Sequence, residues 1–175
     1  GGGAVVSKKI DKNILSSICI QGKTEKGANG RINIHGLNFR ITAMQSALIA
    51  ANIDSYNFNF ERRIQIVKKY FYAFENYRNV LKYPYSAYRN LFNWYVFPIS
   101  PVNYEKVCSE LTIANIQYGH HYKFPLHQEK LFCDYNSHNC PNAENLASKI
   151  LSLPTHTHLS NEQVDYIIQT VISAL

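Results

Sequence analysis

One short stretch of this chain, residues 36–48, joins a turn directly to the start of a helix. Gly36 can adopt backbone conformations that other residues avoid, so it predicts a turn. Thr42 and Gln45 have the spacing of a capping box, in which each side chain hydrogen-bonds the other residue's backbone amide at a helix start. Apolar residues then follow at helical spacing and predict that this helix buries one face: Met44, Ala47, Leu48 and Ala51.

The same stretch carries two side chains that suit an anionic ligand. Asn38 and Arg40 lie between the turn and the helix start. An amide and a forked guanidinium at such a position fit an anionic oxygen, phosphate above all. The residues taken alone favour a structural turn and cap, and the anion site stays open as the alternative.

Composition and charge limit the class of protein. A chain of 175 residues is long enough for one domain with a hydrophobic core. The net charge is +6, but basic residues pair only locally, as in Lys8-Lys9, Arg62-Arg63 and Lys68-Lys69. Nucleic-acid binding normally shows a clustered basic stripe, so no nucleic-acid partner is expected and a small anionic ligand fits the surplus charge. No apolar run is long enough for a membrane span, so no membrane association is expected.

The cysteines and histidines predict neither disulfides nor a metal site. Cys19, Cys108, Cys133 and Cys140 lack CxxC spacing, and no signal peptide is visible, which indicates reduced thiols in a cytoplasmic protein. Histidines and cysteines are frequent over residues 120–158. A zinc site needs four converging ligands, usually in closely spaced pairs, and Cys133 and Cys140 are too far apart for such a pair.

The first half of the chain predicts mainly helices. Residues 4–7 are typical of a short strand, and residues 11–20 of a short helix that ends near Gly22, followed by a polar loop up to Gly36. Residues 42–77 predict two helical stretches, with a break in the weak helix formers at 52–57. The second stretch has a repeating apolar face: Ile64, Val67, Tyr70 or Phe71, and Phe74.

The second half predicts helices that alternate with short strands. Asn93–Phe97 is the best strand candidate, and residues 117–122 are a second one. Helices are expected to start at Ser100-Pro101 and at Pro141, since proline suits a first helical turn. Ser160 and Gln163 form another capping box before a terminal apolar helix. This alternation predicts an α/β or α+β fold.

Five segments, in this order along the chain, are similar to motifs of the DegT/StrS-type sugar aminotransferases. Gly2–Val6 resembles the segment shortly after the lysine that bonds the cofactor, and Gly36–Ala47 resembles the G-x-N-x-R motif with its following helix. Glu61–Arg63 resembles the E-R-R pattern, and His121–His127 resembles the "HYP-PLH" segment. Cys140–Glu144 and Leu151–Pro154 resemble the closing "P-AE" and "LSLP" motifs.

This resemblance implies the α/β fold of the C-terminal portion of a fold-type-I aminotransferase. Residues 1–41 would be the end of the large cofactor-binding domain, residues 42–77 the interdomain helical region and residues 78–175 the small C-terminal domain. It also implies pyridoxal 5'-phosphate (PLP) as cofactor, a homodimer with shared active sites, and substrates that are a nucleotide-linked keto sugar and an amino-acid donor, usually glutamate.

The resemblance further assigns candidate site residues. Asn38 would reach the cofactor phosphate of the other subunit, and Arg40 would serve the same phosphate or the substrate's anionic groups. His127, a loop histidine near Pro125, is by residue type more often a surface or structural residue, and the resemblance makes it a substrate-binding candidate. His121 is a second candidate that could equally pack within a strand. The catalytic lysine and the groups that contact the pyridine ring would lie upstream, so no catalytic residue is assigned and the isolated chain is expected to be inactive.

Three functional hypotheses remain open. The chain could be part of an active sugar aminotransferase, or a truncated non-catalytic remnant that at most dimerises. The third is a small nucleotide-sugar-binding module. The strand-like opening after Gly1–Gly3, with no preceding partner, favours the view that the chain is a fragment.

Overall fold

The computed structural model describes residues 5–23, 31–84, 92–135 and 139–175, without the side chains of 133–135. It divides into two compact units, which we call the N-terminal unit (Gly1–Tyr56) and the C-terminal unit (Asn57–Leu175). We describe each unit by itself. The boundary lies inside the helical region predicted at residues 42–77, and the three-part division made from the sequence stays a prediction.

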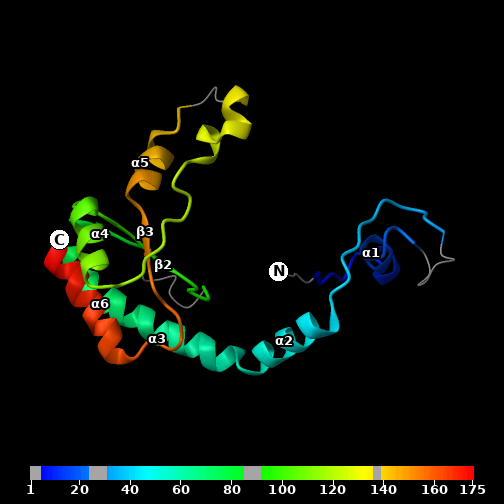
Figure 1. Cartoon of the computed structure of the whole chain (residues 1–175), viewed down its shortest axis with the longest axis horizontal. Coiled ribbons are helices and arrows are strands. Elements are labelled where there is room, and N and C mark those ends of the chain that lie inside the picture. The colour runs from blue at the N-terminus through cyan, green and yellow to red at the C-terminus, as the bar shows by residue number, and fades with distance from the viewer. Residues whose placement is uncertain (1–4, 24–30, 85–91, 136–138) are drawn as a thin grey trace. The chain divides into compact units, whose positions relative to one another are not determined.

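Two helices form the regular structure described for the N-terminal unit, and Figure 1 shows them in blue and cyan. Helix α1 (Lys12–Cys19) starts where the Asp11 carboxylate accepts a hydrogen bond from the Asn13 amide at 2.8 Å. Helix α2 (Ala43–Asp54) starts at the predicted capping box, and both of its reciprocal hydrogen bonds are present. The sequence prediction of a helix start at Thr42 is therefore confirmed.

The N-terminal unit departs from two sequence expectations. Helix α2 has no buried residue, and Met44 and Leu48 are 76% and 60% exposed, so the predicted buried stripe is wrong for this chain. The part of residues 4–7 that is described, Val5–Ser7, forms no strand. Both differences have one cause: an apolar helix face or a strand needs a packing partner, and the described residues of this unit do not supply one.

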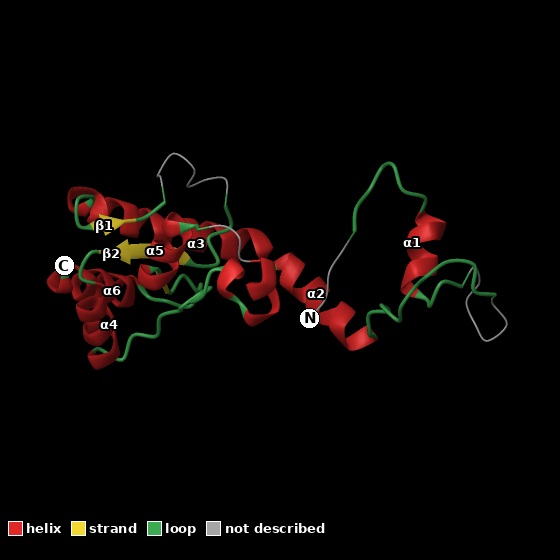
Figure 2. Cartoon of the chain, turned by 90° about the horizontal axis from the view of Figure 1, so that it is seen from above, coloured by secondary structure: helices red, strands yellow, loops and turns green. Residues whose placement is uncertain are grey.

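The C-terminal unit contains a small antiparallel sheet in the order β1-β2-β3. Figure 2 labels its strands β1 and β2. Strand β1 (Leu81–Lys82) pairs with the end of β2 (Phe97–Pro101), so that Leu81 lies opposite Pro101. Strand β3 (Leu151–Leu153) pairs with the start of β2, so that Phe97 lies opposite Leu153. On the other side of β3, its residue Ser152 exchanges two backbone hydrogen bonds with Gly119, which forms an isolated bridge.

Four longer helices accompany this sheet among the described residues. Helix α3 (Tyr56–Phe74) continues into a 3-10 turn, η1 (Glu75–Tyr77). Helix α4 (Tyr104–Ile113) packs on α6 (Asn161–Ala174), and both α4 and α5 (Pro141–Lys149) contact β2. Two further 3-10 segments precede α5: η3 (Leu126–Gln128) and η4 (Lys130–Tyr135). The starts predicted at Pro141 and Ser160 are confirmed.

Three sequence expectations in this unit are wrong. Residues 93–96 are not a strand, because buried Trp94 has φ 48°, which an extended strand does not allow; β2 starts at Phe97. No helix starts at Pro101, which belongs to β2, and α4 starts at Tyr104 instead. Residues 117–122 supply only the bridge at Gly119, and Tyr122 has φ 57°, which breaks the extended backbone.

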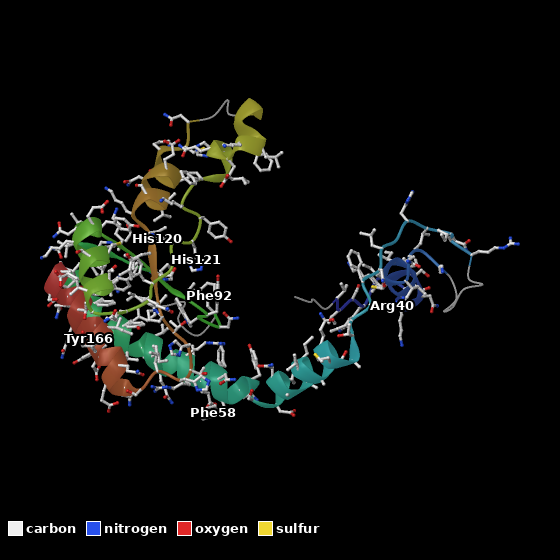
Figure 3. All side chains as sticks on the ribbon, viewed as in Figure 1. Arg40, Phe58, Phe92, His120, His121 and Tyr166 are labelled. Atoms are coloured by element: carbon white, nitrogen blue, oxygen red, sulfur yellow. The ribbon has the colours of Figure 1, made fainter. Side chains whose placement is uncertain are left out.

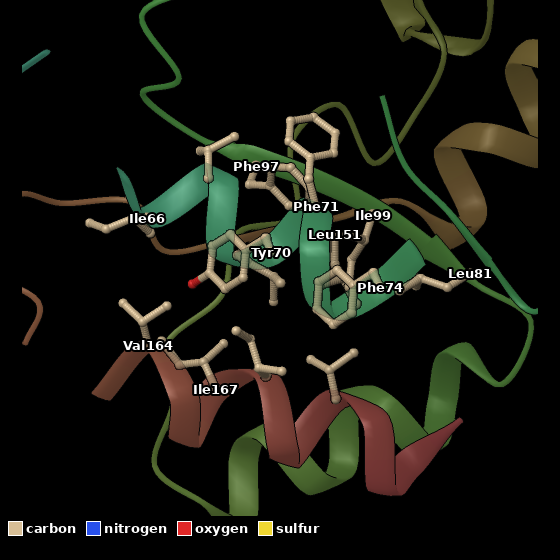
Figure 4. Packing of buried hydrophobic residues seen from close by; sticks show 14 of the residues in the cluster. Ile66, Tyr70, Phe71, Phe74, Leu81, Phe97, Ile99, Leu151, Val164 and Ile167 are labelled. Carbon is tan, nitrogen blue, oxygen red and sulfur yellow. The ribbon is translucent and has the colours of Figure 1, made fainter. Parts of the chain in front are cut away.

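The hydrophobic core lies where α3 faces both the sheet and α6, as Figure 4 shows. Tyr70 and Phe74 lie between α3 and α6, while Phe71 makes an edge-to-face contact with Phe97 of β2, with ring centroids 5.2 Å apart. The Tyr70 hydroxyl donates to the Pro154 carbonyl at 2.9 Å, so this buried polar group is satisfied. The periodic apolar face predicted for α3 is confirmed by the burial of Val67, Tyr70, Phe71 and Phe74.

Polar contacts fix the position of α6 against α3. The Arg62 guanidinium donates to the Leu159 carbonyl at 2.6 Å and to the Asn161 side-chain oxygen at 3.0 Å. Further along both helices, Lys69 of α3 and Asp165 of α6 form an ion pair at 2.6 Å. These contacts lie at the N-terminal end of α6 and hold it against α3.

Candidate functional site

The segment that carries Asn38 is held by the C-terminal end of α1. The Leu37 amide donates to the Ile18 carbonyl at 2.9 Å and the Phe39 amide donates to the Cys19 carbonyl at 3.0 Å. Gly36 is required at the entry to this segment, because a Cβ there would collide with the backbone at Gly22. The predicted turn at Gly36 thus corresponds to a close approach of two backbone segments, which fixes where Asn38 starts.

Asn38 and Arg40 are hydrogen-bonded to each other. The Arg40 Nε donates to the Asn38 Oδ1 at 3.2 Å. A guanidinium has donors only, so the Asn38 atom that faces it must be the oxygen, and the amide NH₂ is left with two donors for another group. Both side chains are exposed within the described part of the chain. The pair therefore presents hydrogen-bond donors and a permanent positive charge together (Figure 3 labels Arg40).

A cavity of about 790 Å³ lies beside this pair, and all of its lining residues belong to the N-terminal unit. Lys12 and Arg40 are its charged lining residues, and no described lining residue is acidic. Apolar side chains, including Leu15 and Phe39, complete the wall. The start of α2 lies at the Gln45 side of the cavity and adds the partial positive charge of a helix N-terminus. This donor set fits a phosphate group that carries an organic ring.

The two histidine candidates lie in the C-terminal unit, in different surroundings. His127, on η3, is within 2.9 Å of the Glu144 carboxylate through its Nε2. His121 is 3.0 Å from the Ser152 hydroxyl through its Nδ1, and its ring lies over Gly119, where any added Cβ would collide with it. Figure 3 shows His121 next to His120 on the segment that follows α4. The contacts of His121 favour the packing alternative.

A second cluster of titratable groups lies at the start of α4. The Tyr104 hydroxyl is 2.7 Å from the His120 Nδ1, and burial raises the pKa of Tyr104 to about 12. Burial also raises the pKa of the Cys108 thiol, which makes it a weaker nucleophile than an ordinary cysteine. These groups line a cavity of about 620 Å³ together with Glu144. Cys19, Cys108 and Cys140 are free thiols.

Sequence reasoning missed the roles of Lys12 and Glu144. Lys12 lines the cavity because α1 packs beside the segment that carries Asn38. Lys12 and Asn38 are 26 residues apart, so no local pattern in the sequence indicated this contact. Glu144 was noted only as part of a motif. Its position in the first turn of α5 was a weak signal, but its contact with His127 depends on how η3 and α5 meet.

No helix within the described residues is long and apolar enough to cross a membrane. Within the same residues, no group of three or more histidine, cysteine and acidic side chains is arranged to hold a metal ion. Apart from His121, the sequence-predicted site residues lie in two places: beside the cavity at Asn38 and at the contact of His127 with Glu144.

Comparison with known proteins identifies related enzymes. The chain is 25% identical over 137 residues to the dTDP-3-amino-3,6-dideoxy-alpha-D-galactopyranose transaminase of Aneurinibacillus thermoaerophilus, an alignment that covers 78% of this chain and 37% of that protein. A DegT DnrJ EryC1 StrS aminotransferase from Brucella abortus superposes with a TM-score of 0.80 at 26% identity, covering 91% of this chain and 42% of that one. This chain thus spans less than half the length of both.

A third relative was solved with a cofactor. NtdA from Bacillus subtilis, with bound cofactor PMP, superposes with a TM-score of 0.79 at 17% identity over 90% of this chain and 38% of that one. At this identity the likeness shows the fold, which is that of the C-terminal part of a fold-type-I aminotransferase, as the sequence resemblance predicted. The DegT/DnrJ/EryC1/StrS aminotransferase family model matches residues 1–172, and the chain belongs to this family.

Proposed function

We propose that this chain is the C-terminal part of a PLP-dependent aminotransferase that moves an amino group from an amino-acid donor, such as glutamate, onto a nucleotide-linked keto sugar. Family membership over residues 1–172 supports the reaction class. The nucleotide sugar is supported by the activity of the Aneurinibacillus relative, a dTDP-sugar transaminase. PLP is supported by the NtdA structure with PMP, which is the amine form of the same cofactor.

The observation that carries this proposal is the hydrogen-bonded pair of Asn38 and Arg40. The pair lies beside a cavity whose described lining residues include no acidic side chain. In the proposed site, the Asn38 amide donates to the cofactor phosphate, and Arg40 fixes the orientation of that amide while it supplies a permanent cation. Charge-assisted hydrogen bonds of this kind are the strong ones. When bound, PLP supplies the electron sink for the transamination chemistry. The residues of this chain bind and orient it.

We further propose that Asn38 acts across a homodimer, on the cofactor held mainly by the other subunit. The exposure of Asn38 and Arg40 supports this, because a group that serves another subunit must face outward within its own. The apolar side chains exposed on α2, such as Met44 and Leu48, support a subunit or domain contact beside it. His127 would contact the sugar substrate from the C-terminal unit.

The test uses the full-length enzyme and mixed dimers. Asn38→Ala should weaken cofactor retention by about 1–3 kcal/mol, the loss expected for a hydrogen bond to a charged group, as measured by cofactor absorbance after dialysis. Asn33→Ala, an exposed asparagine of the same unit outside the cavity lining, is the matched control and should retain the cofactor.

Mixed dimers test the placement of Asn38 across the interface. When the Asn38→Ala subunit is mixed with a subunit that lacks the cofactor-bonding lysine, one of the two sites is assembled from intact halves, and part of the activity should return. If both parents fold and dimerise but mixing never restores activity, Asn38 does not act across the interface.

A non-catalytic dimerisation or binding module is the second candidate, and the exposed apolar face of α2 is the observation that favours it. Glutamate-dependent turnover of a nucleotide keto sugar by the full-length protein would exclude it. The isolated 175-residue chain should show no such turnover, and turnover by this chain alone would contradict our assignment of the catalytic residues to an upstream segment.

A further inference from the structure

The contact between His127 and Glu144 joins two motifs that lie apart in the sequence. The His127 Nε2 is 2.9 Å from the Glu144 Oε1, and the two side chains are 19% and 35% exposed. His127 lies on η3, which follows the loop of the C-terminal unit that begins after Gly119, and Glu144 lies in the first turn of α5. The pair is therefore shielded from water on most of its surface but keeps one exposed side.

Glu144 is itself held in place by the backbone. Its Oε1 also accepts a hydrogen bond from the Cys140 amide at 3.4 Å, at the N-cap of α5. No side chain caps this helix otherwise, since the N-cap residue is a cysteine that makes no such bond. The carboxylate thus satisfies the amide of the N-cap residue, and the helix N-terminus stabilises its negative charge.

This arrangement fixes which nitrogen of the His127 ring carries the proton. One oxygen, Oε1, receives both the Cys140 amide and the His127 Nε2. The amide can only donate, so this oxygen acts as an acceptor, and an ionised carboxylate has no proton to give. The His127 Nε2 must therefore be the donor. In the neutral ring the other nitrogen, Nδ1, is then an acceptor, and no described residue forms a hydrogen bond with it.

We propose that Glu144 is a positioning residue that holds His127 in the Nε2–H form, so that Nδ1 accepts a hydrogen bond from a hydroxyl group of the sugar substrate. This inference rests on the proposed function, which supplies the sugar. A hydroxyl donor is the chemistry that an unprotonated ring nitrogen recognises, and a sugar ring presents several. Without Glu144 the two neutral forms of the ring would be close in energy, and part of the population would present the wrong group.

The first test needs only this chain. Nitrogen NMR of the imidazole rings, at about pH 9, where an ordinary histidine is neutral, reports the form of each ring. His127 should be in the Nε2–H form in the wild type and in Glu144→Gln. In that variant the Cys140 amide still donates to the side-chain oxygen, which orients this oxygen so that it can also accept from His127 Nε2. In Glu144→Ala it should become a mixture. Glu162→Ala, which removes the first-turn carboxylate of α6, should leave His127 unchanged.

His120 serves as an internal reference in all four samples, because it is bonded to Tyr104 and not to Glu144. A wild-type His127 in the Nδ1–H form would overturn the inference, and this result needs no variant to fold. An unchanged Nε2–H form in Glu144→Ala would overturn it equally.

The second test uses the full-length enzyme and separates positioning from mere folding. Glu144→Ala should raise the KM for the nucleotide sugar about tenfold, as the loss of one hydrogen bond would, with a smaller change in kcat. His127→Ala should do the same, and the double variant should be no worse than His127→Ala alone. Glu144→Gln should restore most of the affinity.

The outcomes distinguish the inference from the proposed function. If the wild-type enzyme shows no glutamate-dependent turnover, the proposed function fails. If it is active and His127→Ala raises KM while Glu144→Ala does not, the proposed function stands and the positioning role of Glu144 fails.

Discussion

The two units of this chain differ in how their structure is held together. In the C-terminal unit, α3, α4, α6 and the sheet bury a continuous hydrophobic core. In the N-terminal unit no described apolar residue is buried, and Val6 is 96% exposed. Backbone hydrogen bonds between the end of α1 and residues 37–39, together with the caps of α1 and α2, hold the described part of that unit. Burial supplies most folding free energy, so the C-terminal unit should be the stable one.

The difference also separates the two candidate sites. The donors proposed for the cofactor phosphate, Asn38 and Arg40, lie in the unit without a buried apolar core, and His127 lies in the unit with one. A cofactor contact of that kind becomes rigid only when other polypeptide covers the exposed apolar side chains around it. His127 and Glu144 are held instead by their contact with each other and by the packing of α5 on β2, within their own unit.

The largest expected effect comes from separating the units. A protein of residues 57–175 should keep a cooperative urea-unfolding transition, because the whole described core lies within it. A peptide of residues 1–56 should show no cooperative transition by circular dichroism. Loss of the transition in residues 57–175 would contradict the division of stability between the units.

The same substitution in each unit should give opposite results. Leu111→Ala removes a fully buried side chain of α4 and should lower the free energy of unfolding by about 2–5 kcal/mol. Leu48→Ala on α2 removes a side chain that is 60% exposed and should change it by less than about 0.5 kcal/mol. Both values come from urea unfolding of the full chain. Equal effects would mean that α2 is packed in solution.

A smaller effect is expected at Tyr70, and it depends on pH. Burial raises the pKa of this phenol, so its contribution to stability is present below the pKa of an unfolded tyrosine, about 10, and is lost as the pH rises above that value. Tyr70→Phe should cost about 1 kcal/mol at neutral pH, through the lost bond to Pro154, and should flatten the decline between about pH 9 and 11. Tyr72→Phe, at an exposed position of α3, should leave the decline unchanged.

The smallest effects concern the two capping boxes. Ser160→Ala should lower the stability of the C-terminal unit by about 1 kcal/mol, because α6 packs on its core. Thr42→Ala removes an equivalent cap from α2 and should leave that unfolding transition unchanged, with only a small loss of helical circular dichroism signal. A shift of the transition by Thr42→Ala would show that α2 and the core unfold together.

Local patterns were predictable from the sequence, and long-range pairing was not. The two capping boxes and the apolar face of α3 depend on residues within one or two turns, so their spacing was sufficient. Pro101 looked like a helix start, yet it lies opposite Leu81 in the sheet, and pairing over twenty residues leaves no local signal. Trp94 has good strand propensity, but its burial is achieved with φ 48°.

The candidate site shows the same limit. Asn38 and Arg40 are two residues apart, and the sequence already suggested that they act together. Glu144 was not predicted as a partner of His127, because seventeen residues separate them and their contact exists only once η3 and α5 meet. The spacing of apolar residues predicted that one face of α2 is buried. Burial of that face needs a packing surface that the described part of this chain does not contain.

The pairing of α3 with α6 also sets an order of events during synthesis. Lys69 and Asn161, which bond across the two helices, are 92 residues apart in sequence. At about 5–20 residues per second, a ribosome needs roughly 5–20 s to extend the chain from one to the other. Throughout that interval Tyr70 and Phe74 lack the α6 side chains that cover them in Figure 4. The nascent chain therefore presents an aromatic surface on α3 for several seconds before α6 can cover it.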